Sequence, residues 1–197
     1  MRRIFPLTAG LALVLSACAT ADNNRYYTLV PPAAPVAQTA QAATTWVRFT
    51  AVRVPDVLDR SNMVVRSGQQ QVVPLSHSFW RSPLQQELQD AFSTALQSDG
   101  RIALSPNLGF ARTAPEYAVQ LGLERLDIAL GQFVRMDVSW TVQKLPAHGD
   151  AKTVVCRASW SQTLSEASVD AAVAAQQTMV QQWAQQVQGQ LLAGAGC

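Results

Sequence analysis

The sequence is poor in the residues that most enzymes use for chemistry. It has only two histidines, His77 and His148, and three cysteines in 197 residues. A catalytic histidine needs a partner that orients it, and the sequence around neither histidine suggests one. The G-x-S-x-G elbow, the P-loop, the dinucleotide fingerprint and any Cys/His spacing suited to zinc are absent. We therefore expect a protein that is not an enzyme and that holds no metal or cofactor.

Charge is also scarce, and it is balanced. Charged residues make up 14% of the chain and hydrophobic residues 48%. The basic excess comes from Arg2 and Arg3, because the chain without residues 1–17 has 13 basic and 13 acidic residues. Binding to nucleic acid needs a basic surface, so no nucleic-acid partner is expected. The apolar content suffices for a single core, and no apolar run after residue 17 reaches transmembrane length.

The first segment has the pattern of an export signal. Arg2 and Arg3 precede an apolar stretch over residues 5–15 that is too short to span a bilayer. The next residues, Leu15-Ser16-Ala17-Cys18, resemble the lipobox of bacterial lipoproteins, in which a peptidase cuts before a cysteine that carries diacylglycerol. We expect residues 1–17 to be a lipoprotein signal peptide and Cys18 to be lipidated. The alternative is a plain signal peptide with a chance cysteine.

The residues after Cys18 bear on location. Two or more acyl chains anchor a protein stably, at about 0.8 kcal/mol per buried methylene. Lipoproteins kept at the inner membrane often carry Asp after the cysteine, so Ala19 indicates the outer membrane, on its periplasmic face. Residues 18–44 are rich in Pro, Ala and Gln and are expected to form a tether. Within it, residues 25–29 carry two tyrosines and a leucine, and are expected to add a short strand or to dock on the domain.

Cys156 and Cys197 are the remaining cysteines. The exported compartment allows disulfides to persist, so the two can pair. The alternative is a buried free Cys156 and a free terminal Cys197, because the sequence does not give the distance between them.

The domain is expected over residues 45–197. The alternation of apolar residues predicts strands at 46–54, 63–67, 71–74, 101–104, 117–130, 134–142 and 154–160. A phase change near Glu124 is typical of a β-bulge. Short turns at 130–132 and 146–150 predict that the last three strands form an antiparallel meander.

Two amphipathic helices are also expected. Ser82 is predicted to cap the first, with Pro83 at its first position and apolar residues at helical spacing up to Leu96. The second follows Ser168 and ends near Gly194. The predicted fold class is α+β, an antiparallel sheet with two amphipathic helices packed on it.

Phe79 and Trp80 precede the first helix, in a segment expected to be a loop with His77. They are a candidate partner-docking pair. The alternative is a hydrophobic staple that packs on the start of the helix.

Several segments together resemble one family. They are Tyr26-Tyr27-Thr28-Leu29 after a lipidated cysteine, Val54-Pro55-Asp56-Val57-Leu58-Asp59-Arg60 followed by Met63-Val64-Val65, Phe79-Trp80-Arg81-Ser82-Pro83-Leu84 opening a helix, and a Trp-bearing C-terminal helix after Ser159-Trp160-Ser161. In this order and spacing they resemble the ABC-type transport auxiliary lipoproteins, the PqiC-like family. The resemblance covers nearly the whole chain after Cys18.

The resemblance implies a role and partners. It implies an outer-membrane lipoprotein that docks the periplasmic MCE-domain (PqiB-like) protein of an ABC-type lipid-transport system and assembles into a homo-oligomeric ring. It carries over no catalytic residue. Two alternatives stay open: a carrier that itself binds a lipid or small hydrophobic ligand, and a structural lipoprotein of another envelope machine. A cavity lined by Leu121, Leu123, Met136 and Val138 would favour the carrier, and a filled core the docking subunit.

Overall fold

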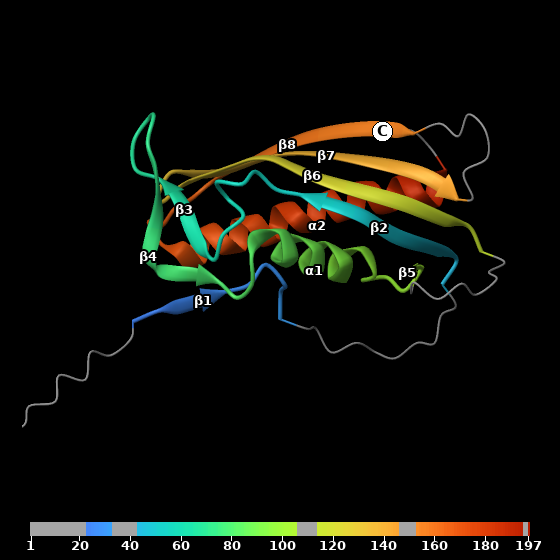
Figure 1. The fold of residues 1–197 in the computed structure, drawn as a ribbon, viewed down its shortest axis with the longest axis horizontal. Helices are drawn as coiled ribbons and strands as arrows, with labels where there is room; N and C mark the ends of the chain where they lie inside the picture. Colours follow the sequence, from blue (N-terminus) through green and yellow to red (C-terminus); the bar gives the residue numbers. More distant parts are fainter. Residues whose placement is uncertain (1–22, 33–42, 106–113, 146–152, 195–196) are drawn as a thin grey trace, which may run out of the picture.

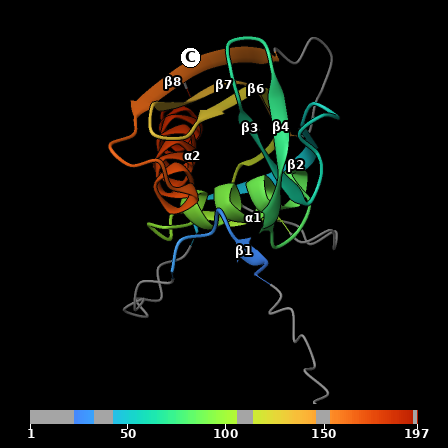
Figure 2. The same ribbon diagram turned by 90° about the vertical axis from the view of Figure 1, so that its left-hand side faces the viewer.

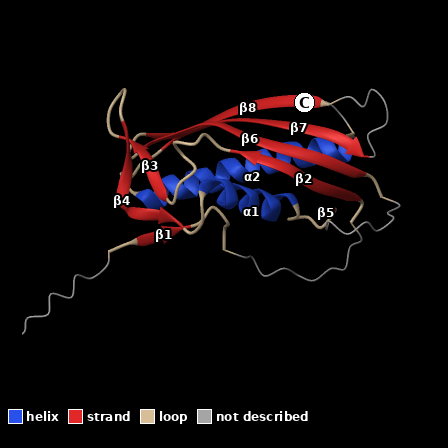
Figure 3. Ribbon diagram, viewed as in Figure 1, coloured by secondary structure: helices blue, strands red, loops and turns tan. Residues whose placement is uncertain are grey.

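The structure, a computed structural model, describes residues 23–32, 43–105, 114–145, 153–194 and 197. Cys18, His148 and the turn predicted at 146–150 lie outside the described residues. Within these ranges the chain forms eight strands in two sheets and two helices, as Figure 3 shows. The predicted α+β fold class is confirmed.

The larger sheet has the strand order β5-β2-β6-β7-β8. Its strands are β2 (Thr45–Arg53), β5 (Ile102–Leu104), β6 (Glu116–Ala129), β7 (Phe133–Leu145) and β8 (Val154–Thr163). The last three form the predicted antiparallel meander, and the predicted bulge lies between Leu123 and Arg125. The β2 strand pairs in parallel with both β5 and β6, so this sheet is mixed.

The smaller sheet stands at one end of the larger one and has the order β1-β4-β3 (Figure 1). Its strands are β1 (Arg25–Tyr27), β3 (Asn62–Arg66) and β4 (Val72–Trp80). The strands predicted at 63–67 and 71–74 are present and form a hairpin across Gly68, and the predicted N-terminal strand is present too. However, β4 does not end at Pro74. Its far end pairs with β1 and with Asn62, and these partners keep His77, Phe79 and Trp80 in a strand where a loop was predicted.

The helices α1 (Leu84–Leu96) and α2 (Val169–Ala193) lie against one face of the larger sheet, which curves over them in Figure 2. Ser168 caps α2 as predicted, because its Oγ accepts a hydrogen bond from the backbone N–H of Ala171 at 3.1 Å. The prediction that Ser82 caps α1 is wrong. The N-cap is Pro83, and the Ser82 hydroxyl donates instead to a carboxylate of the helix, Glu87.

Aromatic side chains connect the sheet to both helices in the core. The Phe92 ring of α1 lies 5.8 Å from Phe49 of β2 and 5.1 Å from Trp183 of α2, both in edge-on geometry. Trp183 also lies 6.4 Å from Trp140 of β7. Because Phe92 and Trp183 are almost completely buried, this chain of rings fixes the position of the helices on the sheet.

Candidate anchoring and docking surfaces

Glu87 joins the N-terminal segment to the first helix. Its position in the helical repeat places Glu87 on the buried face of α1 with Leu84 and Leu88, and its side chain is 0% exposed. One carboxylate oxygen accepts hydrogen bonds from the Thr28 hydroxyl at 2.7 Å and from the Leu29 N–H at 2.9 Å. A buried carboxylate is tolerated only when its oxygens are hydrogen-bonded or paired. The residues after β1 supply these bonds, so they are held in place by Glu87.

The other Glu87 oxygen faces the segment between β4 and α1. It accepts hydrogen bonds from the Ser82 hydroxyl at 2.7 Å and from Arg81 Nε at 3.2 Å. Burial by itself raises the pKa of Glu87. The hydrogen bonds from Ser82, Thr28 and the Leu29 N–H, with the Arg81 charge, outweigh that effect and hold the pKa of Glu87 below its ordinary value. Glu87 is therefore ionised at neutral pH, and both of its carboxylate oxygens accept hydrogen bonds.

Further contacts fasten the same N-terminal segment to β4, to the residue after it, and to α2. β1 pairs in parallel with the end of β4, and the Tyr27 carbonyl accepts a hydrogen bond from the Arg81 N–H at 2.8 Å. The Thr28 carbonyl accepts another from Gln177 Nε2 of α2 at 3.1 Å, and the Leu29 side chain is 1% exposed in the core. We call residues 25–29 with Glu87 the N-terminal clamp.

The two residues of the candidate docking pair, Phe79 and Trp80, differ in burial. Trp80 is 3% exposed and belongs to the core, so its ring is not available to a partner in this structure. Phe79 is half-buried and stacks on Tyr26 with ring centroids 5.6 Å apart. Tyr26 is 68% exposed. The accessible aromatic surface is thus Tyr26 with part of Phe79, at the N-terminal clamp.

An apolar groove lies between the smaller sheet and β6. Its volume is about 180 Å³, and it is lined by Pro55, Val57, Leu58, Val64, Val72, Leu126 and Ile128 with polar residues at its rim. Val57 and Val72 are among the most exposed large hydrophobic residues described. Arg66 Nη2 spans the groove to Asp127 Oδ1 at 2.6 Å. Sequence reasoning missed this groove, because it forms between strands that are distant in the chain.

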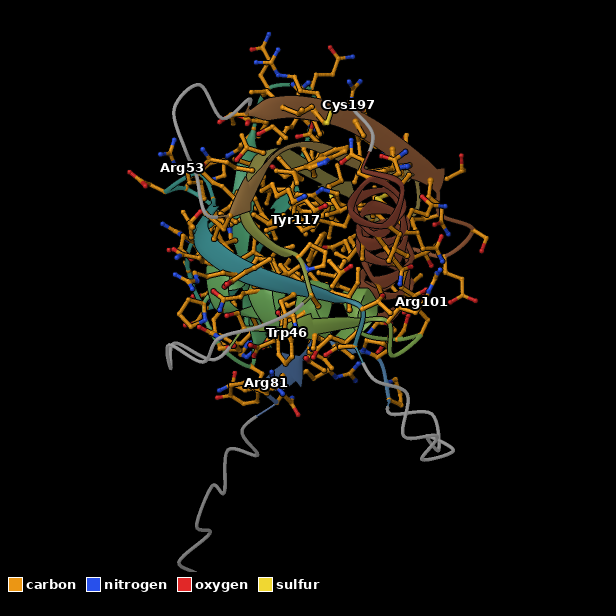
Figure 4. All side chains as sticks on the ribbon, turned by 90° about the vertical axis from the view of Figure 1, so that its right-hand side faces the viewer. Trp46, Arg53, Arg81, Arg101, Tyr117 and Cys197 are labelled. Atoms are coloured by element: carbon orange, nitrogen blue, oxygen red, sulfur yellow. A yellow bond between two sulfur atoms is a disulfide. The ribbon has the colours of Figure 1, made fainter. Side chains whose placement is uncertain are left out.

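A disulfide joins the C-terminus to the edge of the larger sheet. Cys156 of β8 and Cys197 are bonded, with Cα atoms 5.6 Å apart. Gln190 of α2 connects this end to the core, because its side-chain oxygen accepts a hydrogen bond from Trp140 Nε1 at 2.6 Å. In Figure 4 Cys197 lies on the side of the molecule opposite Arg81, which contacts the N-terminal clamp.

Two features of other protein classes were not found. In the described part of the chain, no helix combines the length and apolar character needed to cross a bilayer. Over the same residues, no three His, Cys, Asp or Glu side chains gather closely enough to hold a metal ion.

Comparison with known proteins identifies the family. The fold is similar to that of an uncharacterized protein (TM-score 0.63, 15% identity, 85% of this chain and 97% of that one). It is also similar to protein XCC0632 from Xanthomonas campestris (TM-score 0.60, 16% identity, 86% of this chain and 96% of that one). No curated protein matches in sequence. A family model described as the ABC-type transport auxiliary lipoprotein component matches residues 27–188, and the chain therefore belongs to this family of lipoproteins.

Proposed function

We propose that the protein is a non-enzymatic subunit of an ABC/MCE-type lipid-transport system of the bacterial envelope. In this proposal residues 1–17 are removed, and Cys18 carries acyl chains that hold the protein at the periplasmic face of the outer membrane. The domain docks the periplasmic MCE-domain component there, as one protomer of a ring. The family match supports the transport role, and the resemblance of Leu15-Ser16-Ala17-Cys18 to a lipobox supports the anchor.

The N-terminal clamp is the observation that carries this function in the structure. A domain joined closely to its anchor stays beside the membrane, where a partner that reaches the membrane can meet it. Residues 25–29 begin seven positions after Cys18 and are bound to β4, α1 and α2. A lipid on Cys18 would therefore be joined to the folded domain through the short stretch that ends at β1, and not through the longer segment that ends at β2.

Crosslinking in intact cells tests the partner. We expect the protein with an intact Cys18 to crosslink to an MCE-domain protein, identified by mass spectrometry. The Cys18→Ala variant should leave the membrane fraction and lose that crosslink. A partner from a secretion or pilus system would instead favour a structural lipoprotein of another envelope machine, and a variant that still sediments with membranes would contradict the anchor.

The carrier alternative has one supporting observation, the apolar groove. Its volume of about 180 Å³ is smaller than the roughly 300–1,000 Å³ of typical ligand pockets. Leu121, Leu123, Met136 and Val138, which were expected to line a carrier's cavity, are at most 3% exposed and pack in the core cluster. We therefore favour the docking subunit. Lipid found by mass spectrometry in protein purified without detergent would favour the carrier.

A further inference from the structure

The N-terminal clamp shortens the connection between Cys18 and the domain. A chain reaching from Cys18 to β2 would extend up to about 95 Å, at roughly 3.6 Å per residue. The docked β1 instead begins at Arg25, and the same rule limits the reach from Cys18 to about 25 Å. This limit follows from the position of β1 in the sequence and from covalent geometry.

The surface at this end has the chemistry of a membrane interface. Tyr26 is 68% exposed and stacks on Phe79, so an amphipathic ring projects from the strand nearest to the anchor. Tyrosine rings favour the headgroup layer of membranes, where the ring meets apolar atoms and the hydroxyl meets water. Arg25 and His77 are exposed beside this ring pair, and the Arg25 guanidinium suits anionic lipid headgroups.

We propose that the β1 side of the domain, with Tyr26 at its centre, lies against the membrane interface. This inference rests on the proposed acylation of Cys18. The short connection keeps the surface within reach of lipid, and the ring of Tyr26 enters the headgroup layer. Figures 1 and 2 both place β8 on the side opposite β1, so β8 and the disulfide face away from the membrane.

A fluorophore attached at position 26 tests the orientation. In the full acylated chain with its disulfide formed, Tyr26→Cys provides the single free thiol. The matched control is Val72→Cys, which is also exposed and lies at the far end of β4, about 20 Å from the residues that pair with β1. Both are reconstituted in vesicles of phosphatidylethanolamine and phosphatidylglycerol.

We expect a label at position 26 to shift its emission to the blue and to lose quenching by iodide when the protein is on vesicles. The label at position 72 should stay accessible to iodide. Equal accessibility at the two positions, whether both are open or both are protected, would overturn the proposed orientation.

A spacer tests whether the short connection is the cause. A flexible Gly/Ser insertion of about 15 residues between Asp22 and Asn23 lengthens the reach without changing the surface. Protection at position 26 should then decrease, and unchanged protection would overturn the role given to the short connection. Mass spectrometry of the same samples separates the two proposals. A bare Cys18 contradicts the anchor, whereas an acylated, vesicle-bound protein with an accessible label contradicts only the orientation.

Discussion

The N-terminal strand and the C-terminal cysteine are both held against the domain, but by different chemistry. The N-terminal clamp consists of hydrogen bonds to the buried carboxylate of Glu87 and a short parallel pairing with β4. The C-terminus is held by one covalent bond, from Cys197 to Cys156 of β8. The first attachment can open and close at equilibrium, whereas the second opens only on reduction.

This difference indicates which attachment depends on solution conditions. The clamp requires Glu87 in its ionised form and the four groups that donate hydrogen bonds to it. Acid and point substitutions should therefore weaken the clamp. The disulfide does not titrate, and it opens only on reduction. If both attachments were equally sensitive to acid, or equally sensitive to reductant, the comparison would fail.

Replacing Glu87 should have the largest effect. In Glu87→Ala the buried Leu29 N–H loses its acceptor, which costs about 1–3 kcal/mol. The hydrogen bonds from Thr28 and Ser82 to the charged carboxylate are lost as well, at about 1.5–3 kcal/mol each. We expect urea unfolding to show this loss. Hydrogen exchange should increase at residues 25–30 and stay unchanged in β8.

The control for Glu87 is Asp90→Ala. Asp90 accepts a hydrogen bond from the same Arg81, at 3.3 Å, but its side chain is 38% exposed. Exposed ion pairs contribute about 0–1 kcal/mol, so this variant should be nearly as stable as the wild type. Equal losses in the two variants would mean that burial of the carboxylate does not matter.

Removing the disulfide should have the next effect. Cys156 and Cys197 are 41 residues apart, and a disulfide closing a loop of this size typically stabilises a fold by about 2–4 kcal/mol. Cys197→Ser should lower the free energy of unfolding by this amount and make it insensitive to dithiothreitol. Exchange should increase at the end of α2 and not at residues 25–30. Faster exchange at both ends would indicate that the attachments are coupled.

Acid should weaken the clamp selectively. Because the folded-state pKa of Glu87 is below its ordinary 4.5, its ionised form stabilises the fold above that pH, and this contribution is lost as the pH falls through the folded-state value. Asp99 and Asp137 also have lowered pKa values, so the wild type and Glu87→Gln should be compared directly. Below about pH 4.5 the wild type should lose more stability than the variant. Parallel curves would contradict the assignment.

Thr28→Val should have the smallest effect. The variant loses the hydroxyl that donates to Glu87 and accepts from the Val30 N–H at 3.1 Å, but it keeps the side-chain shape and the Leu29 N–H contact. Each hydrogen bond contributes about 1 kcal/mol, somewhat more when the acceptor is charged. Urea unfolding should show a small loss, and Thr94→Val, which removes a solvent-exposed hydroxyl bond within α1, should show less. A larger loss for Thr94→Val would contradict the role of Thr28.

Local patterns predicted most of the elements. The apolar spacing from Leu84 to Leu96, the cap at Ser168 and the alternation along β6, β7 and β8 each depend on neighbouring residues, and these predictions are confirmed. The parallel pairing of β2 with β5 and β6 was not predicted. Alternation shows which residues share a face, but it does not show which distant strand lies alongside.

The N-terminal clamp could be predicted only in part. Tyr26, Tyr27 and Leu29 indicated that this segment contacts the domain. Glu87, which accepts hydrogen bonds from the segment, was not predicted. A sequence signal for Glu87 existed, because an acidic residue three positions after Leu84 falls on the apolar face of the helix. The Ser82 cap was predicted from a frequent pattern, but the hydroxyl is more strongly attracted to the buried carboxylate.

The partners of β1 also determine when it can dock. Ser78 pairs with Arg25, Glu87 binds Leu29, and Gln177 follows Thr28 by 149 residues. In the proposed export from the N-terminus, β1 would emerge first, its partners Ser78 and Glu87 would follow, and Gln177 would arrive only with the last helix. Pairing of β1 therefore requires β4 and α1, and its full set of contacts requires α2 as well.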